Sequence, residues 1–397
     1  MTAAEAPAEE AEIASVVAEA ADRREPLVIS GRDTKRAMLR PVQAARSLST
    51  RNLQGVTLYS PKELVFAARA GTTLDAVEAA VAAEGQHLIA EPPDLTALLG
   101  TEGSQTLGGV VAANLSGPRR IAWGAMRDHV LGVRAVNGTG EVIRSGGRVL
   151  KNVTGLDLCK LFTGSHGTLA VLTEITLKVL PAPEQTGTLV LPGVDGEAGV
   201  RALSAALGSP FGVSGAAWLP AEAAARVPAL AGFAGPVALA RVEDFEASVS
   251  YRLGRLRELL GGAGETLGDE QSRAIWRAVR DVVPLPAEPS DAVWRVSVRP
   301  SLGPRVLRSL GGRGFLDWGG GLVWVAGPAT AEAHAAIADA ARGARGTWML
   351  LRAPEPLRAV VEVVPPEPAP LARITRRVKA ALDPHGILNP GRIYAGV

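Results

Sequence analysis

The stretch from Gly100 to Leu180 constrains this chain most, because it sets glycines between short apolar runs more densely than core packing requires. Glycine loses more backbone entropy on folding than any other residue, so a cluster of glycines indicates a geometric need. Backbone N–H groups crowding around a diphosphate are one such need, since a Cβ obstructs the approach. The pattern is neither GxxxxGK[ST] nor the Rossmann GxGxxG in a strand-turn-helix context. We therefore expect a nucleotide cofactor held by a different arrangement of loops.

Composition limits the class of protein. The chain has 397 residues, 47% of them hydrophobic, which is enough to bury the cores of two or more units. Its 42 basic and 40 acidic residues leave a net charge of +2, so neither nucleic acid nor a membrane surface is an expected partner. The single cysteine, Cys159, excludes an internal disulfide and favours buried packing for this side chain. The N-terminal residues lack a signal peptide's basic start, and no apolar run approaches the ~20 residues of a membrane span. We expect a cytoplasmic protein.

Hydrophobic periodicity predicts alternating elements in the first part of the chain. Helices are expected over residues 11–24, 73–84 and 106–114, and strands at 27–29, 56–60, 64–70 and 88–90. Residues 131–137 and 141–145 flank a glycine-containing loop and predict a hairpin, and strict alternation over 169–180 predicts one long strand. This order indicates α/β architecture.

Pro181 and Pro183 predict a domain boundary. The region after them repeats strand and helix patterns, which suits a sheet covered by helices on one face. Its tryptophans are interpreted as anchors of a core or an interface: Trp276, Trp294, Trp318 and Trp324. A basic amphipathic helix over 371–382 and a tight turn close the chain. The expected domains are residues 1–182, 183–369 and 370–397.

Several words of the sequence resemble a known family. They are VTLYSPKEL, EPPD, QTLGGVVAANLSGPRR, RDHVLGVRAVNG, SGGRVLKNVTGLDLCKLFTGSHGTLAVLTE and the terminal ILNPGRIY. They are similar to the FAD-binding domain of the vanillyl-alcohol oxidase or PCMH type, and more closely to the FAD-binding E subunit of bacterial glycolate oxidase. The resemblance implies an α+β fold: a PCMH-type FAD-binding domain of two α/β subdomains, an α+β cap domain with an antiparallel sheet, and a C-terminal tail that returns to the FAD domain.

The resemblance also implies where FAD binds. Its pyrophosphate is expected between the SGRDTK loop, residues 30–35, and the QTLGG turn. Arg32 and Asp33 depart from the small residues usual in the first loop: Arg32 suits a phosphate, and Asp33 repels one unless it turns away. This loop lacks the histidine that attaches FAD covalently in some members, so non-covalent FAD is expected. The residues implied for the pyrophosphate are Gln105, Thr106, Gly108 and Gly109, and those for the flavin and adenosine side are Gly164, Ser165, Gly167, Thr168 and Val171.

Several other polar residues have more than one possible role. Arg119, Arg120 and Arg127 are candidates for binding FAD or a substrate carboxylate, and surface ion pairing is as good an interpretation. His129 and His166 are weak candidates for a catalytic base, with a structural role favoured for both. Asp128 suits either a turn cap or the cofactor. No metal site is expected.

The resemblance implies an FAD-binding subunit of a glycolate oxidase or dehydrogenase complex, which oxidises glycolate to glyoxylate in glycolate catabolism. A D-type flavin subunit and an F-type iron–sulfur subunit are the implied partners, and a small 2-hydroxy acid is the implied substrate. The cap lacks the GHxGDGN word of the D subunits, and one cysteine cannot hold an iron–sulfur cluster. Two rival hypotheses remain: a self-sufficient FAD-linked oxidase of another 2-hydroxy acid or alcohol, and a scaffold that has lost FAD.

Overall fold

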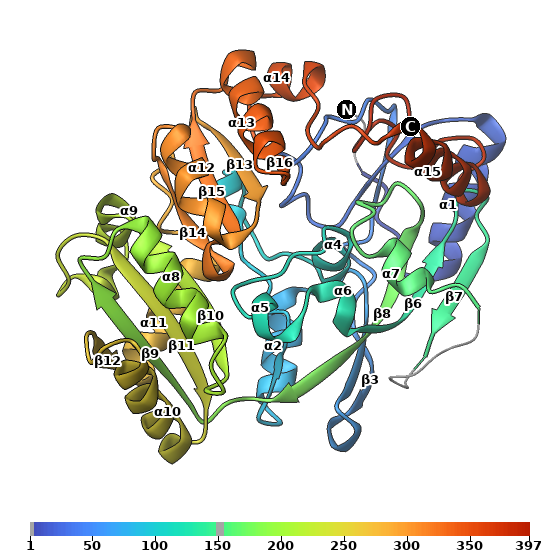
Figure 1. Ribbon diagram of the computed structural model, residues 1–397. Helices are drawn as coiled ribbons and strands as arrows, with labels where there is room; N and C mark the ends of the chain where they lie inside the picture. The colour runs from blue at the N-terminus through green and yellow to red at the C-terminus, as the bar shows by residue number, and fades with distance from the viewer. Residues whose placement is uncertain (1–3, 148–154) are drawn as a thin grey trace. The chain divides into compact units, whose positions relative to one another are not determined.

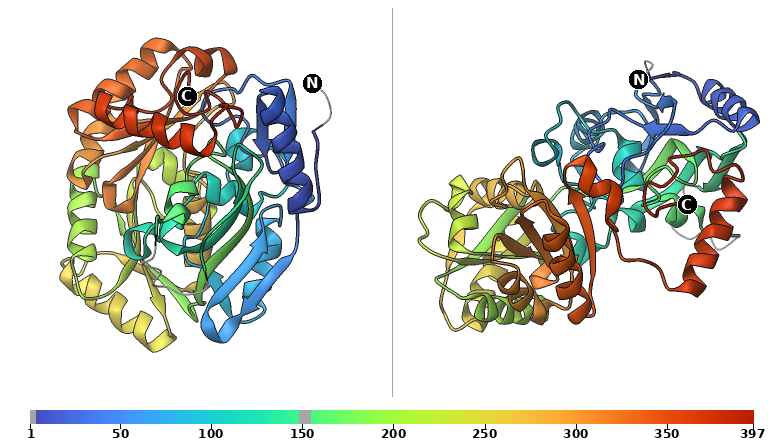
Figure 2. Two further views of the ribbon diagram at one scale, coloured as in Figure 1. Left: turned by 90° about the vertical axis from the view of Figure 1, so that its right-hand side faces the viewer. Right: turned by 90° about the horizontal axis from the view of Figure 1, so that it is seen from above.

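The computed structural model describes residues 4–147 and 155–397, which form two compact units (Figure 1). The first unit comprises the chain up to Leu115, then Gly124–Ala182 and Pro366–Val397. Both chain ends, marked in Figure 2, belong to it. The second unit comprises Pro183–Pro365 and also the short excursion Ser116–Trp123. Residues 1–182, 183–369 and 370–397 remain the proposed domains along the sequence. Residues 148–154 of the SGGRVLKNVTG word lie outside the described residues.

The first unit begins with a small layer of one helix and two strands. Helix α1 (Glu10–Arg23) precedes β1 (Leu27–Ser30), which pairs in parallel with β2 (Arg46–Ser49). The apolar face of α1, including Ile13 and Val17, packs with Leu27 and Leu48 in one buried cluster. The 3.6-residue period of this segment is thus explained by burial of one helix face.

A second, antiparallel sheet completes the first unit. Its order is β3-β4-β8-β6-β7, with β5 beside β8. The central strand β8 runs over Val171–Pro181, where alternation predicted a long strand, and it pairs with β4, β5 and β6. The other strands are β3 (Val56–Ser60), β4 (Val65–Arg69), β5 (Gln86–Leu88), β6 (Val130–Val136) and β7 (Val142–Gly146). The helices of this unit are η1 (Pro61–Glu63), α2 (Leu74–Ala82), α3 (Thr96–Leu99), α4 (Leu107–Ala112), α6 (Met126–His129), α7 (Leu158–Phe162) and α15 (Ala369–Leu382). Cys159, on α7, is buried as expected.

The second unit is one antiparallel sheet with helices, as the resemblance implies. Its strand order is β12-β9-β11-β10-β14-β15-β13-β16. The strands are β9 (Gln185–Pro192), β10 (Val213–Leu219), β11 (Val237–Asp244), β12 (Glu265–Leu267), β13 (Ala292–Ser297), β14 (Gly314–Asp317), β15 (Leu322–Gly327) and β16 (Thr347–Arg352). The helices are α5 (Arg120–Trp123), α8 (Gly196–Leu207), α9 (Ala221–Ala225), η2 (Pro228–Leu230), α10 (Glu246–Leu259), α11 (Asp269–Arg280), η3 (Pro300–Leu302), α12 (Gly303–Ser309), η4 (Trp318–Gly320), α13 (Ala331–Gly343) and α14 (Glu355–Val360).

The helices of the second unit cover both faces of its sheet, so the prediction of one covered face is wrong. A Cβ on Gly187 of β9 would touch Leu253 of α10. The next residue, Thr188, accepts a hydrogen bond of 2.9 Å from the indole of Trp276 on α11. Successive strand residues point to opposite faces, so α10 and α11 lie on opposite sides. Sequence periodicity shows that a helix is amphipathic but not which face of a sheet it covers.

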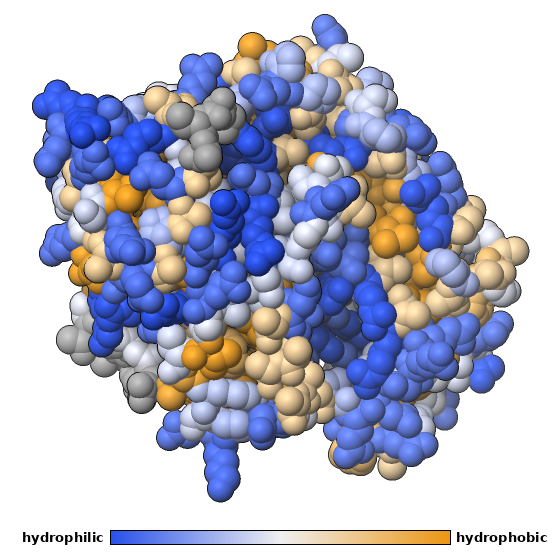
Figure 3. Space-filling model, turned by 180° about the vertical axis from the view of Figure 1, so that it is seen from behind, coloured by the Kyte–Doolittle hydropathy of each residue, from blue (hydrophilic) through white to orange (hydrophobic). Residues whose placement is uncertain are grey.

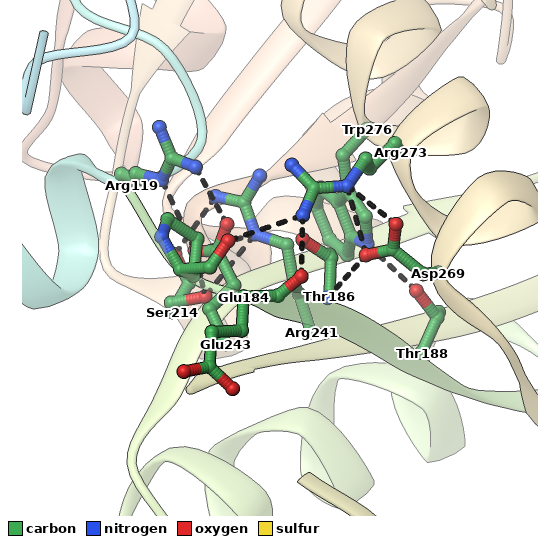
Figure 4. A network of polar contacts seen from close by, with 11 residues as sticks. Arg119, Glu184, Thr186, Thr188, Ser214, Arg241, Glu243, Asp269, Arg273 and Trp276 are labelled. Carbon is green, nitrogen blue, oxygen red and sulfur yellow. Dashed lines mark hydrogen bonds and ion pairs between the residues drawn. The ribbon is translucent and has the colours of Figure 1, made fainter. Parts of the chain in front are cut away.

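A buried network of polar side chains lies on the sheet face that α11 covers (Figure 4). The Arg241 side chain is 1% exposed, and its guanidinium lies 4.7 Å from the Trp276 ring centroid. Glu243 is shared by Arg241 at 3.4 Å and Arg119 at 2.6 Å, and it accepts a hydrogen bond from Ser214. Burial acts to raise the pKa of Glu243, but Arg241 and Arg119 outweigh it and hold that pKa far below its usual range. Arg119 therefore anchors the excursion Ser116–Trp123 in the second unit.

No helix within the described parts of the chain is long and apolar enough to cross a bilayer. On the face drawn in Figure 3, hydrophobic residues form separate patches between hydrophilic ones.

Candidate flavin site

The loop that follows β1 lies against the QTLGG turn. Thr50 N donates to Ser30 O at 2.9 Å, and Ser49 Oγ donates to Gly31 O at 2.6 Å, so β2 holds the loop from one side. A Cβ added to Gly31 would lie 2.2 Å from Thr106 Oγ1. Only glycine permits this approach, since heavy atoms at that distance overlap. The two segments that the sequence assigned to the pyrophosphate are thus neighbours in space.

The QTLGG turn is fixed by its own hydrogen bonds. Thr106 caps α4 by accepting from Gly109 N at 3.1 Å. Gln105 Nε2 donates to Pro93 O at 2.8 Å. Gly108 N donates to Ala70 O at 2.8 Å, and a Cβ on Gly108 would lie 2.8 Å from the Ala70 Cβ. Gly108 therefore allows close backbone packing, while Gly109 faces the first loop, with the Lys35 Nζ 3.8 Å from where its Cβ would be.

The GSHGT loop contacts the C-terminal end of α4, whereas the QTLGG turn forms its N-terminal end. Gly164 N donates to Val111 O at 3.1 Å and His166 N donates to Ala112 O at 2.9 Å. His166 has φ of 53°, a left-handed conformation unusual for a residue other than glycine. Thr168 Oγ1 donates to Ser165 O at 2.7 Å, which closes the turn. Ser165, Gly167 and Thr168 thus belong to one rigid loop beside α4, whereas Val171 is buried in β8.

Residues of the C-terminal tail link the loop after β1, which we call the first loop, to the GSHGT loop, which we call the third loop. Asn389 donates from Nδ2 to His166 O at 2.9 Å and to Ile29 O at 3.2 Å, and its Oδ1 accepts from Ile29 N at 2.8 Å. Arg392 donates to Lys35 O at 3.0 Å. Lys379 donates to Thr168 O at 2.7 Å and pairs with Asp383 at 2.7 Å. These residues were not singled out from the sequence, although the NPGR word that contains two of them was noticed.

The electrostatics of the site favour an anion. Burial lowers the pKa of Lys35 to about 8, with Asp94 opposing the shift. Burial, then the charges of Arg392 and Lys35, lower the pKa of His166 to about 3. An imidazole with so low a pKa is neutral at pH 7 and is a weak base, which favours a structural role for His166.

The residues present fit a phosphate group. Ser30 Oγ is buried and has no hydrogen-bond partner among the described residues. Within the described parts of the chain, the hydrogen bond of Lys35 Nζ is a long one, 3.5 Å, to Thr34 Oγ1. The loop thus carries a hydroxyl without a partner and a desolvated ammonium group, and its Gly31 packs closely against the QTLGG turn. A phosphate would complete this environment. Arg32 and Asp33 are exposed, so the Asp33 carboxylate is not buried in the loop. Asp33 has φ of 58°, and its backbone carbonyl closes a turn by accepting a hydrogen bond from Arg36 N.

Other predicted residues lie outside this constellation. Asp128 is exposed and accepts from Ala125 N at 2.8 Å, which is the turn-cap alternative. Arg127 is exposed and His129 is buried. Arg119 and Arg120 belong to the second unit. Within the described residues no group of three or more His, Cys, Asp or Glu side chains could hold a metal ion.

Comparisons with known proteins concern the fold and the family of this chain. A family model described as FAD binding domain matches residues 2–146, and one described as FAD linked oxidases, C-terminal domain, matches residues 369–393. Among solved structures, p-cresol methylhydroxylase with bound substrate superposes with a TM-score of 0.70 at 13% identity, covering 99% of this chain and 88% of that one. 4-Ethylphenol oxidase from Gulosibacter chungangensis gives a TM-score of 0.69 at 14% identity, covering 98% and 89%. The fold is that of PCMH-type FAD-binding proteins, and the chain is an FAD-linked oxidoreductase.

Sequence similarity to curated proteins identifies the family within the FAD-linked oxidoreductases. The glycolate oxidase subunit GlcE of Escherichia coli K12 is 37% identical over 386 residues, which span 96% of this chain and 95% of that protein. The glycolate oxidase subunit GlcD of Bacillus subtilis is 32% identical over 187 residues, 47% of this chain and 38% of that protein. This chain belongs to the family of the glycolate oxidase subunit GlcE. The resemblance inferred from the sequence, its implied fold and FAD as cofactor are thereby confirmed.

Proposed function

We propose that this chain is the FAD-binding subunit of a glycolate oxidase complex, in which glycolate is oxidised to glyoxylate and electrons leave through an iron–sulfur subunit. The observation that supports the proposal most is the packing of the first loop against the QTLGG turn, with Lys35 Nζ next to Gly109, in a chain similar to GlcE along nearly its whole length. The similarity to part of GlcD supports a D-type flavin subunit as partner. An F-type iron–sulfur subunit and a cytoplasmic location remain predictions from the sequence.

The site residues would hold FAD without a covalent bond. Lys35, Ser30 and the Gly109 edge of the QTLGG turn would contact the pyrophosphate, with Gln105, Thr106 and Gly108 shaping that turn. The flavin and adenosine side is assigned to the loop and strand residues Gly164, Ser165, Gly167, Thr168 and Val171. Asp128 stays a weaker member of the set because it caps its own turn. When bound, FAD supplies a two-electron acceptor.

The chain's own residues favour a relay over an independent dehydrogenase. His166 is held neutral and its backbone is fully engaged, so it orients the third loop rather than accepting a substrate proton. No catalytic step is assigned to His129, which is buried, or to Arg127, which is exposed. The chain has one cysteine and cannot supply the thiolates of an iron–sulfur cluster, so electrons need a partner subunit to go further.

Anaerobic reduction of the flavin tests this proposal. The visible spectrum of the purified, FAD-loaded chain is recorded before and after glycolate is added, first alone and then with the D-type and F-type subunits. We expect the flavin band to stay oxidised with the chain alone and to bleach in the assembled complex. The D-type and F-type subunits without this chain, treated identically, are the control for their own flavin.

Bleaching of the chain alone would instead establish the self-sufficient oxidase. If purified chain shows no flavin band even after incubation with FAD, the scaffold hypothesis replaces the proposal.

A further inference from the structure

Trp318 of the second unit is held in an unusual backbone conformation. Its φ is 52°, in the left-handed region that a bulky residue rarely adopts. The Asp317 carboxylate accepts from Trp318 N at 2.7 Å, and the indole Nε1 donates to Gly117 O at 3.2 Å. Backbone strain that the surroundings maintain is found preferentially at ligand sites.

Two arginines approach the same indole. The Arg120 guanidinium lies 4.6 Å from the Trp318 ring centroid and that of Arg295 lies 5.5 Å from it. Arg295 is also 5.2 Å from the ring of Trp324, its cross-strand partner in β15. Two like charges so placed repel each other, although the indoles attract each of them.

Arg295 points away from the sheet face that α13 covers. Its neighbour Trp294 donates to His334 of α13, and adjacent strand residues point to opposite faces. Arg120 comes from the excursion Ser116–Trp123 and is exposed. The two guanidinium groups thus lie on the other face of the sheet, with Arg120 on the solvent side.

The charge of Arg295 is incompletely compensated. Its Nε is buried and has no hydrogen-bond partner among the described residues. Burial, then the Arg120 charge, lowers the pKa of Arg295 to about 10, with Asp317 opposing the shift. Glu243 does not serve it, because that carboxylate is shared by Arg119 and Arg241 (Figure 4). A buried cationic donor left without an acceptor is costly, so a ligand that supplies the acceptor is the economical explanation.

We propose that Arg295 and Arg120 bind the carboxylate group of a small organic acid against the indoles of Trp318 and Trp324. The free Nε and an adjacent Nη form a planar fork that matches the two oxygens of a carboxylate. Indole faces at 5–6 Å favour a flat group beside the guanidinium plane. All four residues belong to the second unit.

Calorimetric titration of the full-length, FAD-loaded chain with oxalate tests the site, since oxalate has no hydrogen to lose and is not oxidised by hydride transfer. Ionic strength is held constant with chloride, and inorganic phosphate is titrated in parallel. We expect one oxalate site, weakened at least tenfold by Arg295→Met and by Arg295→Lys, which keeps the charge and loses the fork. Arg308→Met is the matched control, because Arg308 is an exposed arginine of the same unit that pairs with Glu197, and it should leave affinity unchanged.

The flavin absorbance of each variant separates this proposal from the proposed function. Wild-type flavin content with lost oxalate binding supports the carboxylate site alone. Oxalate binding that survives both Arg295 variants refutes the site. Phosphate that binds as tightly as oxalate refutes a carboxylate as the ligand class. An absence of oxalate binding in the wild-type chain refutes the carboxylate site altogether. If Arg295→Met fails to fold, the Arg295→Lys titration decides alone.

Discussion

Deprotonation of Lys35 should weaken FAD binding above pH 8. In the flavin-free chain, burial lowers the Lys35 pKa from 10.5 to about 8. Its ammonium lies next to Gly109 and the turn assigned to the pyrophosphate. A diphosphate contacting this group favours the charged form and restores a higher pKa in the complex. Binding above pH 8 must therefore take up a proton.

The size of the effect follows from linkage. The Kd for FAD should be flat below pH 8 and should then rise by up to about tenfold per pH unit until the pKa of the complex is reached. If that pKa returns to 10.5, the total change between pH 8 and 10.5 approaches about 300-fold, an upper limit. The stability of the flavin-free chain should rise with pH, whereas FAD binding weakens. Between pH 8 and 10.5 the unfolded chain binds more protons than the folded chain, so the free energy of unfolding of the flavin-free chain increases with pH.

Quenching of flavin fluorescence on binding measures this profile. Lys35→Met should weaken binding at pH 7 and remove the rise above pH 8. Lys62→Met, a change at an exposed lysine of the same unit, should keep the wild-type profile and controls for titration of the flavin itself. A slope above pH 8 that persists in Lys35→Met would show that another group is responsible and that Lys35 does not contact the pyrophosphate.

Two further substitutions test the loops and the tail. Gly109→Glu should abolish flavin binding, because its carboxylate adds bulk and negative charge beside Lys35; a gel-filtered variant with full flavin absorbance would refute the placement of this turn. Lys379→Met should lower the free energy of unfolding by roughly 3 kcal/mol, since it removes the cation from Asp383, whose side chain is 0% exposed. Urea denaturation measures that loss, and Arg373→Met on the exposed side of the same helix should change stability by at most about 0.5 kcal/mol. Equal urea midpoints for the two variants would show that the buried pair contributes little.

The sequence predicts those elements whose pattern records burial on one side. Alternation predicted β8, the glycine-containing loop predicted the hairpin of β6 and β7, and the apolar face of α1 predicted that helix. Strand β10 was not predicted, because all seven of its residues are buried and its small side chains do not alternate. The excursion Ser116–Trp123 was also missed, since local pattern contains no information about which unit a short polar loop joins.

The candidate site was predicted in the same uneven way. Close approach and positive φ leave few residues other than glycine, and Gly109 and Gly167 were named as candidates through the family resemblance, in which such glycines are part of the recognisable words. Lys35 and Asn389 were not singled out. Their importance comes from burial and from hydrogen bonds to residues far away in the sequence, which no local pattern reveals.

The bond between Ile29 and Asn389 joins positions 360 residues apart, and this separation sets an order of events during synthesis. A ribosome adds residues at about 5–20 per second, so the first loop waits tens of seconds for its tail partner. A nascent chain can form α1 and β1 early, whereas this bond forms only after Asn389 has emerged. We expect chains that stop short of the tail to lack it, and to lack with it the tie between Ile29 and His166.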